Sequence, residues 1–252
     1  MIRPVCSVLF WLCLGVPAFS QTLSVAAAAN IGAVERPLQE AFARAHPGMA
    51  LQFTFGASGV LVAQMLHGAP FQAFLSADRG FAQKVVDAGL ATGPVKIYAL
   101  GKLIFLATKA VDLTKGIAVV LDPAVVQFAN SNSETAPYGK AAVEAMTKAG
   151  VYGQAQAKQV TGQSVTQALQ FILTATNFGF VNKSALYSRE VQPYNQEGKF
   201  WFEVDPKLYT PIEQGFVVVK AAEALTEAQA FADFLTSPEA QTVFAAFGYG
   251  RP

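Results

Sequence analysis

The sequence has few charged residues and almost no cysteine or histidine. Asp, Glu, Lys and Arg make up 14% of the 252 residues, against about 25% in an average soluble protein. The apolar fraction of 52% excludes an intrinsically disordered chain, which needs low hydrophobicity and high net charge. Since 18 basic residues face 17 acidic ones, the chain lacks the cationic field that attracts nucleic acid.

The two cysteines lie in an N-terminal segment that is typical of an export signal. Arg3 precedes an apolar run from Val5 to Val16, and small residues stand just before Gln21. We therefore predict a secretory signal peptide over residues 1–20, with cleavage after Ser20. The apolar run is too short to span a bilayer comfortably, and no later stretch reaches about 18 consecutive apolar residues.

The mature chain predicted in this way has balanced charge and no cysteine. Loss of Arg3 reduces the 18 basic residues to 17, equal to the 17 acidic ones. Without cysteine the chain forms no disulfide and no thiolate metal site. The two histidines, His46 and His67, lie on separate predicted helices without a second histidine at zinc-motif spacing, so we expect no zinc site and no cofactor.

Strand-like and helix-like segments alternate along the mature chain. Strands are predicted at 23–29, 51–55, 73–76, 95–100 and 102–108, then at 117–121, 158–160, 178–182, 200–204 and 215–220. Helices are predicted at 31–45, 59–67, 81–88, 140–149, 165–174, 227–235 and 238–247, the last with Ser237 as its N-cap. Such alternation is typical of βαβ units, in which helices cover both faces of a parallel sheet.

The pattern restarts after residue 101, which indicates two lobes of the α/β class. We predict lobe 1 from residues 21–100 and 212–252 and lobe 2 from residues 101–211, each a mostly parallel sheet flanked by helices. The chain crosses between the lobes near Gly101 and Pro211, and these two crossings form a hinge. The crevice between the lobes is the natural place for a ligand.

Five predicted turns carry small or polar residues, and four of these turns lead into helices. The candidate binding residues in them are Ala29, Asn30, Ser58, Tyr138, Val165 and Asn182. Asn30 is a favoured N-cap residue, and Ser164 can cap the helix that begins at Val165. Free N–H groups and helix dipoles at such turns form an anion site. The alternative interpretation is that these residues only cap helices and pack against them.

The five turns contain no lysine or arginine. Neutral donors and helix dipoles bind a dianion without a cation. A site made only of donors disfavours a protonated anion, because the extra proton finds no acceptor. A carboxylate ligand would instead call for an arginine that binds it bidentately. The turns therefore favour a fully ionised oxyanion.

Ser58 is also the candidate nucleophile of a secreted hydrolase. The order Gly56-Ala57-Ser58-Gly59-Val60 departs from the G-x-S-x-G elbow, since Val60 occupies the place of the last glycine. His67, the nearest base in the sequence, lies beyond the helix that follows Ser58. We therefore rank a hydrolase well below an anion-binding site.

Several longer segments add a resemblance that covers essentially the whole mature chain. They are LSVAAAAN after the signal peptide, FGASGVLVAQMLHGAPFQAFLSAD at 55–78, TAPYGKAAVEAM at 135–146, GFVNKSAL at 179–186, YTPIEQGFVVVK at 209–220 and AQAFADFLTSPEAQTVFAAFGYG near the C-terminus. Together they resemble the periplasmic molybdate-binding proteins, the substrate-binding subunits of ABC importers. The run GAPFQAFLSAD is the most specific to this family.

The resemblance implies a two-lobed type II periplasmic binding protein and a set of oxyanion contacts. Asn30 matches the ligand position of the first turn, and Ala29 stands where relatives often have Ser or Thr. Ser58 matches the serine of the second turn, and Tyr138 a ligand tyrosine in the branch that has APYG. Val165 matches a residue that donates its backbone N–H. Asn182 falls where one branch of the family places a tyrosine.

Gln72 stands where relatives usually carry an acidic residue, and we interpret it as a structural position at the entry of a strand.

The resemblance further implies a function without catalysis. We expect an exported, periplasmic, monomeric receptor that captures molybdate or tungstate and delivers it to the permease subunits of an ABC importer. A receptor for sulfate or phosphate remains the alternative within this class, and for phosphate Asp78 and Asp122 are the acceptors nearest by sequence. A hydrolase that uses Ser58, or an interaction module that has lost its ligand, remain the alternatives from other classes.

Overall fold

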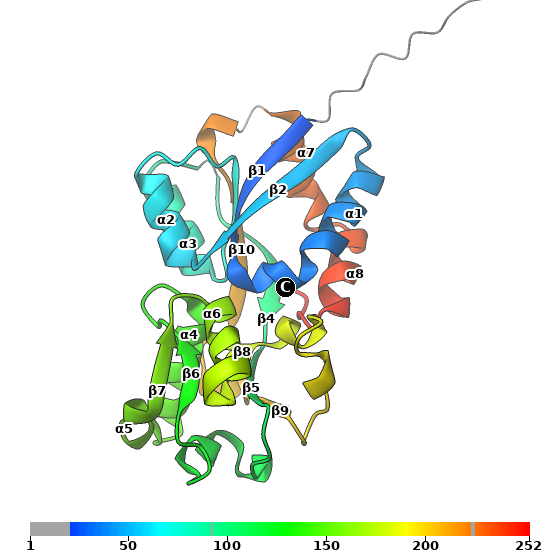
Figure 1. The fold of residues 1–252 in the computed structure, drawn as a ribbon. Coiled ribbons are helices and arrows are strands. Elements are labelled where there is room, and N and C mark those ends of the chain that lie inside the picture. Colours follow the sequence, from blue (N-terminus) through cyan, green and yellow to red (C-terminus); the bar gives the residue numbers. More distant parts are fainter. Residues whose placement is uncertain (1–20, 92, 223–224) are drawn as a thin grey trace, which may run out of the picture.

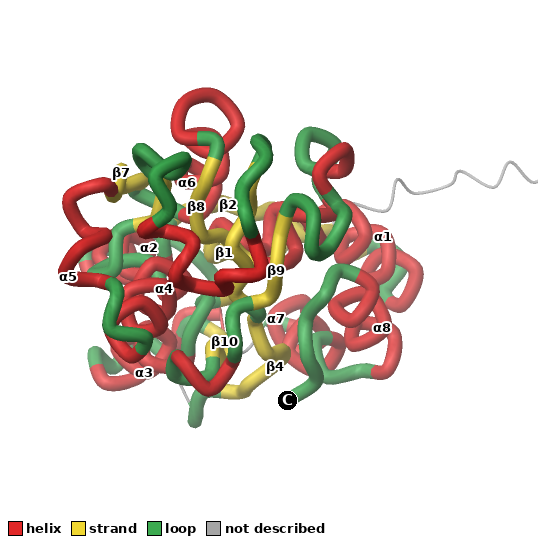
Figure 2. The backbone as a smooth tube through the Cα atoms, turned by 90° about the horizontal axis from the view of Figure 1, so that it is seen from below, coloured by secondary structure: helices red, strands yellow, loops and turns green. Residues whose placement is uncertain are grey.

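The computed structural model describes residues 21–91, 93–222 and 225–252, and these residues form two lobes, each built around one sheet (Figure 1). The strand order is β2-β1-β3-β10-β4 in lobe 1 and β7-β6-β8-β5-β9 in lobe 2. The predicted signal peptide lies outside the described residues. In the view from below, the strands lie centrally with helices around them (Figure 2). The predicted two-lobed α/β architecture is therefore confirmed.

The sheet of lobe 1 has four strands in one direction and one reversed strand. Its strands are β1 (Gln21–Ala28), β2 (Met49–Gly56), β3 (Ala73–Leu75), β4 (Lys96–Gly101) and β10 (Ile212–Val218). β1 pairs in parallel with β2 and β3, whereas β10 is antiparallel to both β3 and β4. The strand that returns from lobe 2 is thus the reversed one.

Helices cover both faces of this sheet. They are the 3-10 helix η1 (Ala29–Val34), α1 (Glu35–Ala45), α2 (Ser58–Leu66), α3 (Arg79–Asp87), α7 (Thr226–Phe234) and α8 (Pro238–Ala246). Phe42, Phe231 and Phe244 from α1, α7 and α8 share one buried cluster, and Leu61 and Val85 from α2 and α3 share another. The two clusters lie on opposite faces of the sheet, as the ribbon shows (Figure 1).

The sheet of lobe 2 repeats this plan. Its strands are β5 (Leu103–Ala107), β6 (Phe128–Ser131), β7 (Gln159–Gly162), β8 (Phe178–Asn182) and β9 (Trp201–Glu203). Its main helices are α4 (Pro137–Lys148), α5 (Tyr152–Ala155) and α6 (Val165–Phe171). β6 is parallel to β7 and β8, and β5, the strand that enters from lobe 1, is antiparallel to β8 and β9. One core cluster fills this lobe.

The C-terminal segment pairs with the chain beside the first of the two crossings between the lobes. β4 runs into β5 through Gly101 and Lys102, and β10 returns to lobe 1 after Pro211. The C-terminal Gly250 exchanges two backbone hydrogen bonds of 2.8 Å with Leu100, next to the first crossing. The C-terminus therefore closes onto the hinge.

Between residues 113 and 131 one predicted strand is wrong and one real strand was not predicted. Residues 117–121 form no strand and belong to 3-10 turns over Leu113–Leu121, broken by Gly116 at φ 55°. The consecutive residues Val119 and Val120 are both buried, so the run lacks the alternation of a strand with one exposed face. The real strand, β6, was not predicted because its Asn130 and Ser131 resemble loop residues, although both are fully buried.

Three helix starts or ends also differ from the prediction. Asn30 is no N-cap, because η1 already begins at Ala29 and has no side-chain cap. α4 begins at Pro137 rather than at 140, with proline in the first turn where its missing N–H costs no hydrogen bond. α6 ends at Phe171 and continues as a π-helical turn to Thr176, which Asn177 closes at φ 62°.

Other local predictions are confirmed. Ser237 caps α8 and Ser164 caps α6, each by accepting a backbone N–H three residues on. Gln72 exchanges hydrogen bonds with Ser24 at the entry of β3. Among the described residues no helix combines the length and apolar character that crossing a membrane requires.

The packing of α4 on β6 gives a test of this fold. A Cβ at Gly139 would overlap the carbonyl oxygen of Ser131, so Gly139→Ala should destabilise the chain by about 1–3 kcal/mol. Gly153→Ala, in α5 of the same lobe, meets nothing within 4 Å and should be neutral or slightly stabilising. Urea unfolding of both variants checks this, and equal stabilities would contradict the packing described.

Candidate functional site

A small cavity lies between the lobes where four helices begin. It is lined by Ala28, Ala29, Asn30, Gly56, Ala57, Ser58, Ala77, Ala136, Pro137, Tyr138 and Val165. Its volume is about 10 Å³. This is about the space of one water molecule and far below the roughly 300–1,000 Å³ of pockets for drug-sized organic solutes.

The sheet topology explains why four helix starts converge here. η1, α2 and α6 begin within three residues of the ends of β1, β2 and β7, and α4 begins six residues after β6. Because the carboxyl ends of these strands in both sheets point to the lobe junction, the N-termini of the helices meet there. Lobe 1 supplies η1 and α2, and lobe 2 supplies α4 and α6.

Three of these four helices begin without a side-chain cap. The N-cap residues of η1, α2 and α4 are Ala28, Ala57 and Ala136, which have no side chain that can accept a hydrogen bond. The first N–H groups of a helix have no partner within the helix. Apart from the Gly59 N–H, which donates to the Thr135 carbonyl, they remain available to an anion at this cavity, and the helix dipoles favour it.

Two hydroxyl groups add donors. Ser58 is buried, and its Oγ accepts the Ala77 N–H at 3.0 Å, which leaves the hydroxyl proton to be donated. Burial, together with the neighbouring Tyr249, raises the pKa of Tyr138 well above its ordinary value. The Tyr138 hydroxyl therefore stays protonated at neutral pH and acts as a donor.

Asn30 lines the cavity, but its side chain is occupied elsewhere. Its Nδ2 donates to Gln214 Oε1 and to Tyr249 Oη, both at 2.8 Å. Because both amide hydrogens are used, Asn30 has only its backbone N–H to offer a ligand. Its Oδ1 is buried and finds no partner among the described residues.

The partners of Asn30 form a buried network that joins the lobes. Tyr249 Oη donates to the Asn30 carbonyl at 2.9 Å, and Ser184 Oγ of lobe 2 donates to Tyr249 Oη at 3.1 Å. Gln214 Nε2 donates to the Ala77 carbonyl at 2.9 Å. Burial, opposed by the hydrogen bonds with Ser184 and Asn30, raises the pKa of Tyr249 to about 12, so this hydroxyl also stays protonated.

The structure thus brings five of the six predicted site residues to one cavity and places the sixth outside it. Ala29, Asn30, Ser58, Tyr138 and Val165 all line the cavity. Asn182 is buried behind it, where its Nδ2 donates to Ser184 Oγ.

Gln214 and Tyr249 were not predicted from the sequence as residues of this network. A glutamine inside the apolar run of β10 was the one local signal for the first. Tyr249 lies 219 residues from Asn30, and nothing near it in the sequence indicates this contact.

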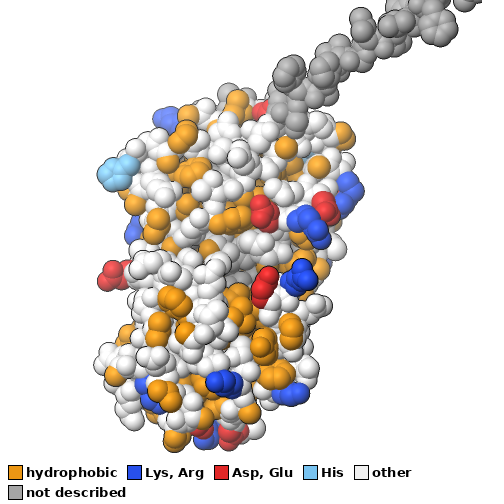
Figure 3. All heavy atoms as spheres, viewed as in Figure 1, with side chains coloured by type: hydrophobic (Ala, Val, Ile, Leu, Met, Phe, Trp, Pro, Cys, Tyr) orange, Lys and Arg blue, Asp and Glu red, His pale blue; other side chains and the backbone are white. Residues whose placement is uncertain are grey.

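The cavity lining contains no charged side chain. On the face shown in Figure 3, basic and acidic side chains are scattered over both lobes without forming a cationic patch. Two larger crevices of about 180 and 200 Å³ lie beside the cavity at the lobe junction, and both contain Asp78 and Lys140. Because they mix carboxylates with cations, they suit a dianion less well than the cavity does.

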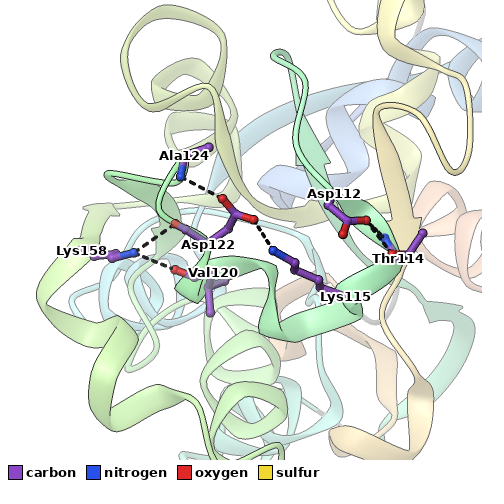
Figure 4. Close-up of polar contacts among 7 residues, drawn as sticks. All are labelled: Asp112, Thr114, Lys115, Val120, Asp122, Ala124 and Lys158. Carbon is purple, nitrogen blue, oxygen red and sulfur yellow. Dashed lines mark hydrogen bonds and ion pairs between the residues drawn. The ribbon is translucent and has the colours of Figure 1, made fainter.

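The two candidate acceptors for a protonated anion lie outside the cavity. Asp78 accepts the Phe81 N–H at 2.7 Å and caps α3; burial raises its pKa, although that hydrogen bond and the charges of Lys140 and Lys84 act in the opposite direction. Asp122 pairs with Lys115 at 2.6 Å in lobe 2 (Figure 4). The cavity therefore has no carboxylate to accept an anion's proton.

The arrangement around Ser58 does not suit a hydrolase. His67 is exposed at the opposite end of α2, about 13 Å along the helix at 1.5 Å per residue. His46 packs against Phe42 in lobe 1, with the rings 4.8 Å apart. Within residues 21–91, 93–222 and 225–252 no cluster of three or more His, Cys, Asp or Glu could hold a metal ion.

The chain is similar to known solute-binding proteins over most of its length. The family model of bacterial extracellular solute-binding proteins matches residues 23–250. The molybdate-binding protein ModA of Rhodobacter capsulatus is 36% identical over 239 residues, 94% of this chain and 91% of the relative. ModA of Azotobacter vinelandii is 34% identical over 230 residues, 90% and 89% of the two chains.

Solved structures match the same extent of chain. The periplasmic molybdate-binding protein of Azotobacter vinelandii superposes with a TM-score of 0.81 at 29% identity, covering 91% of this chain and 99% of the other. The sulfate-binding protein SubI of Mycobacterium tuberculosis has a TM-score of 0.72 at 16% identity, with 91% and 86% covered. The second similarity concerns the fold alone.

Proposed function

This chain belongs to the bacterial extracellular solute-binding proteins, and we propose that it captures molybdate or tungstate between its lobes and delivers the ion to an ABC importer. The relatives at 34–36% identity, which are named as molybdate-binding proteins, support this substrate. The proposed location is the periplasm, reached through the signal peptide at 1–20. The proposed partners are the permease subunits of the importer, approached by a monomer.

The observation that carries the proposal is a cavity at four helix starts whose lining contains no charged side chain. Backbone N–H groups of Asn30, Ser58, Tyr138 and Val165 and the hydroxyls of Ser58 and Tyr138 are the proposed contacts. Ala29 lines the cavity wall. Because relatives often have Ser or Thr at this position, this chain lacks a hydroxyl there. Donors alone favour a fully ionised tetrahedral oxyanion.

We propose that the two lobes move as rigid bodies and close over the ion. Residues 21–100 with 212–252 form one proposed rigid lobe, and residues 101–211 form the other. Because each lobe contributes two helix starts, an ion held by all four favours the closed arrangement over an open one.

Other functions are less well supported. Phosphate keeps a proton at neutral pH, and neither Asp78 nor Asp122 reaches the cavity. Sulfate satisfies the same donors, so cavity size must discriminate against it. A hydrolase is less well supported because neither His46 nor His67 lies near Ser58. We propose no catalysis and no cofactor. We assign Asn182 to the network behind the cavity rather than to the ligand.

Isothermal calorimetry on the mature chain tests the proposal directly. Molybdate and tungstate should bind at micromolar protein, sulfate more weakly because of its smaller size, and phosphate least because its proton lacks an acceptor. Absence of heat with molybdate and tungstate, together with binding of another anion, would refute the proposed substrate.

Removal of the Ser58 hydroxyl tests the donor set. Ser58→Ala should weaken molybdate binding at least about tenfold, since a hydrogen bond to a charged group contributes about 1.5–3 kcal/mol. Ser133→Ala, an exposed serine outside the cavity lining, is the matched control and should bind as the wild type does. Equal affinities for the two variants would exclude Ser58 from the contacts.

The pH dependence tests whether the site is free of titrating groups. Tyr138 is the one titratable side chain of the cavity lining, and burial raises its pKa well above the ordinary value. Its ionisation would remove a donor and add a negative charge, so affinity would fall only above that raised pKa. Between about pH 6.5 and 9 the molybdate affinity should be constant; a change in this range would indicate a titrating group.

A further inference from the structure

One backbone hydrogen bond joins the two lobes at the mouth of the cavity. The Gly59 N–H, in the first turn of α2, donates to the Thr135 carbonyl of lobe 2 at 2.9 Å. Ser58 and Ala136, the neighbours of these two residues, line the cavity. The bond therefore links the chain at the start of α2 to the chain just before α4, directly beside the proposed ligand contacts.

Glycine is required at position 59 by the closeness of the opposite lobe. A Cβ there would lie 3.0 Å from Thr135 Cα and 2.8 Å from the Phe81 ring. The Phe81 ring belongs to lobe 1 and can rotate away. The Thr135 backbone cannot, so any larger residue at 59 pushes the lobes apart.

The side chain of Thr135 is also closely packed. Its Oγ1 is shielded from solvent and has no partner among the described residues. A buried hydroxyl without a partner opposes the arrangement that buries it. Closure of the lobes thus gains the Gly59 hydrogen bond and loses the hydration of the Thr135 hydroxyl.

A second contact between the lobes is weaker. Thr166 Oγ1 of α6 lies 3.5 Å from the Ala29 carbonyl, at the limit of a hydrogen bond. The Gly59–Thr135 contact is consequently the tighter of these two contacts beside the cavity.

We infer that Gly59 and Thr135 are positioning residues that set the separation of the α2 and α4 starts and so control how long the ion stays bound. This inference rests on the proposed function, because it concerns the same cavity. Neither residue lines the cavity. The pair acts by fixing the distance between donors that belong to different lobes, and apparent affinity follows the fraction of molecules in which that distance is correct.

A pair of glycine substitutions separates this role from a structural one. Gly59→Ala should weaken molybdate binding about tenfold, mainly through faster dissociation, while the melting temperature of the unliganded chain stays equal or rises, since alanine favours a helix. Gly32→Ala, in η1 with nothing within 4 Å of its Cβ, is the control and should leave affinity unchanged.

The Phe81 ring and the Thr135 hydroxyl supply two further variants. If the ring alone caused the effect, Gly59→Ala combined with Phe81→Ala would recover wild-type affinity, and the inference would be overturned. Thr135→Val removes the unpartnered hydroxyl and should slow dissociation of molybdate. Stopped-flow and calorimetric measurements on all variants decide, and wild-type dissociation from Gly59→Ala would refute the inference.

Amide hydrogen exchange, measured with and without molybdate, tests the contact without a substitution. The Gly59 N–H has no partner within α2, so exchange slower than that of an unbonded amide in either sample supports its bond to Thr135. Exchange of Gly59 at the rate of an unbonded amide in both samples would overturn the contact. A wild-type chain that binds no molybdate or tungstate refutes the proposed function instead, and the exchange result still decides the inference.

Discussion

The structure depends on hydrogen-bond donors that helices cannot satisfy themselves. η1, α2 and α4 begin after alanines that offer no cap, and each leaves N–H groups without an internal partner. Alone, each helix start would be solvated or capped. Two sheets that direct the carboxyl ends of their strands to one junction collect these starts around a single cavity. Because helix N-termini supply the donors, the cavity favours an anion without any charged side chain in its lining.

The polar network behind the cavity holds this arrangement in place. Asn30, Gln214, Ser184 and Tyr249 are buried, and burial of polar groups is tolerated only when hydrogen bonds compensate for lost water. Here the bonds run from the turn at Asn30 to strand β10, to lobe 2 and to the C-terminal segment. The Asn30 side chain therefore orients its own turn, and in the proposed site only its backbone N–H is left for the ligand.

The parts of the fold that local chemistry determines could be predicted from the sequence. Ser164 and Ser237 cap helices through residues three positions away, and small residues before Ser58 mark a tight strand-to-helix turn. The strand β6 could not be found, because Asn130 and Ser131 are polar and their burial comes from the surrounding lobe. The role of the Asn30 side chain depends on Tyr249, and the lobe contact depends on Thr135 meeting Gly59; both arise only from tertiary packing.

The closing of the C-terminus onto the hinge has a consequence for the order of assembly. β10 lies between β3 and β4, and Gly250 pairs with Leu100, so lobe 1 combines the first and the last parts of the chain. Its sheet cannot be completed until nearly all residues have been synthesised. In a chain that we propose is exported, this discontinuity delays compaction and would help the unfolded polypeptide to pass through a translocation channel.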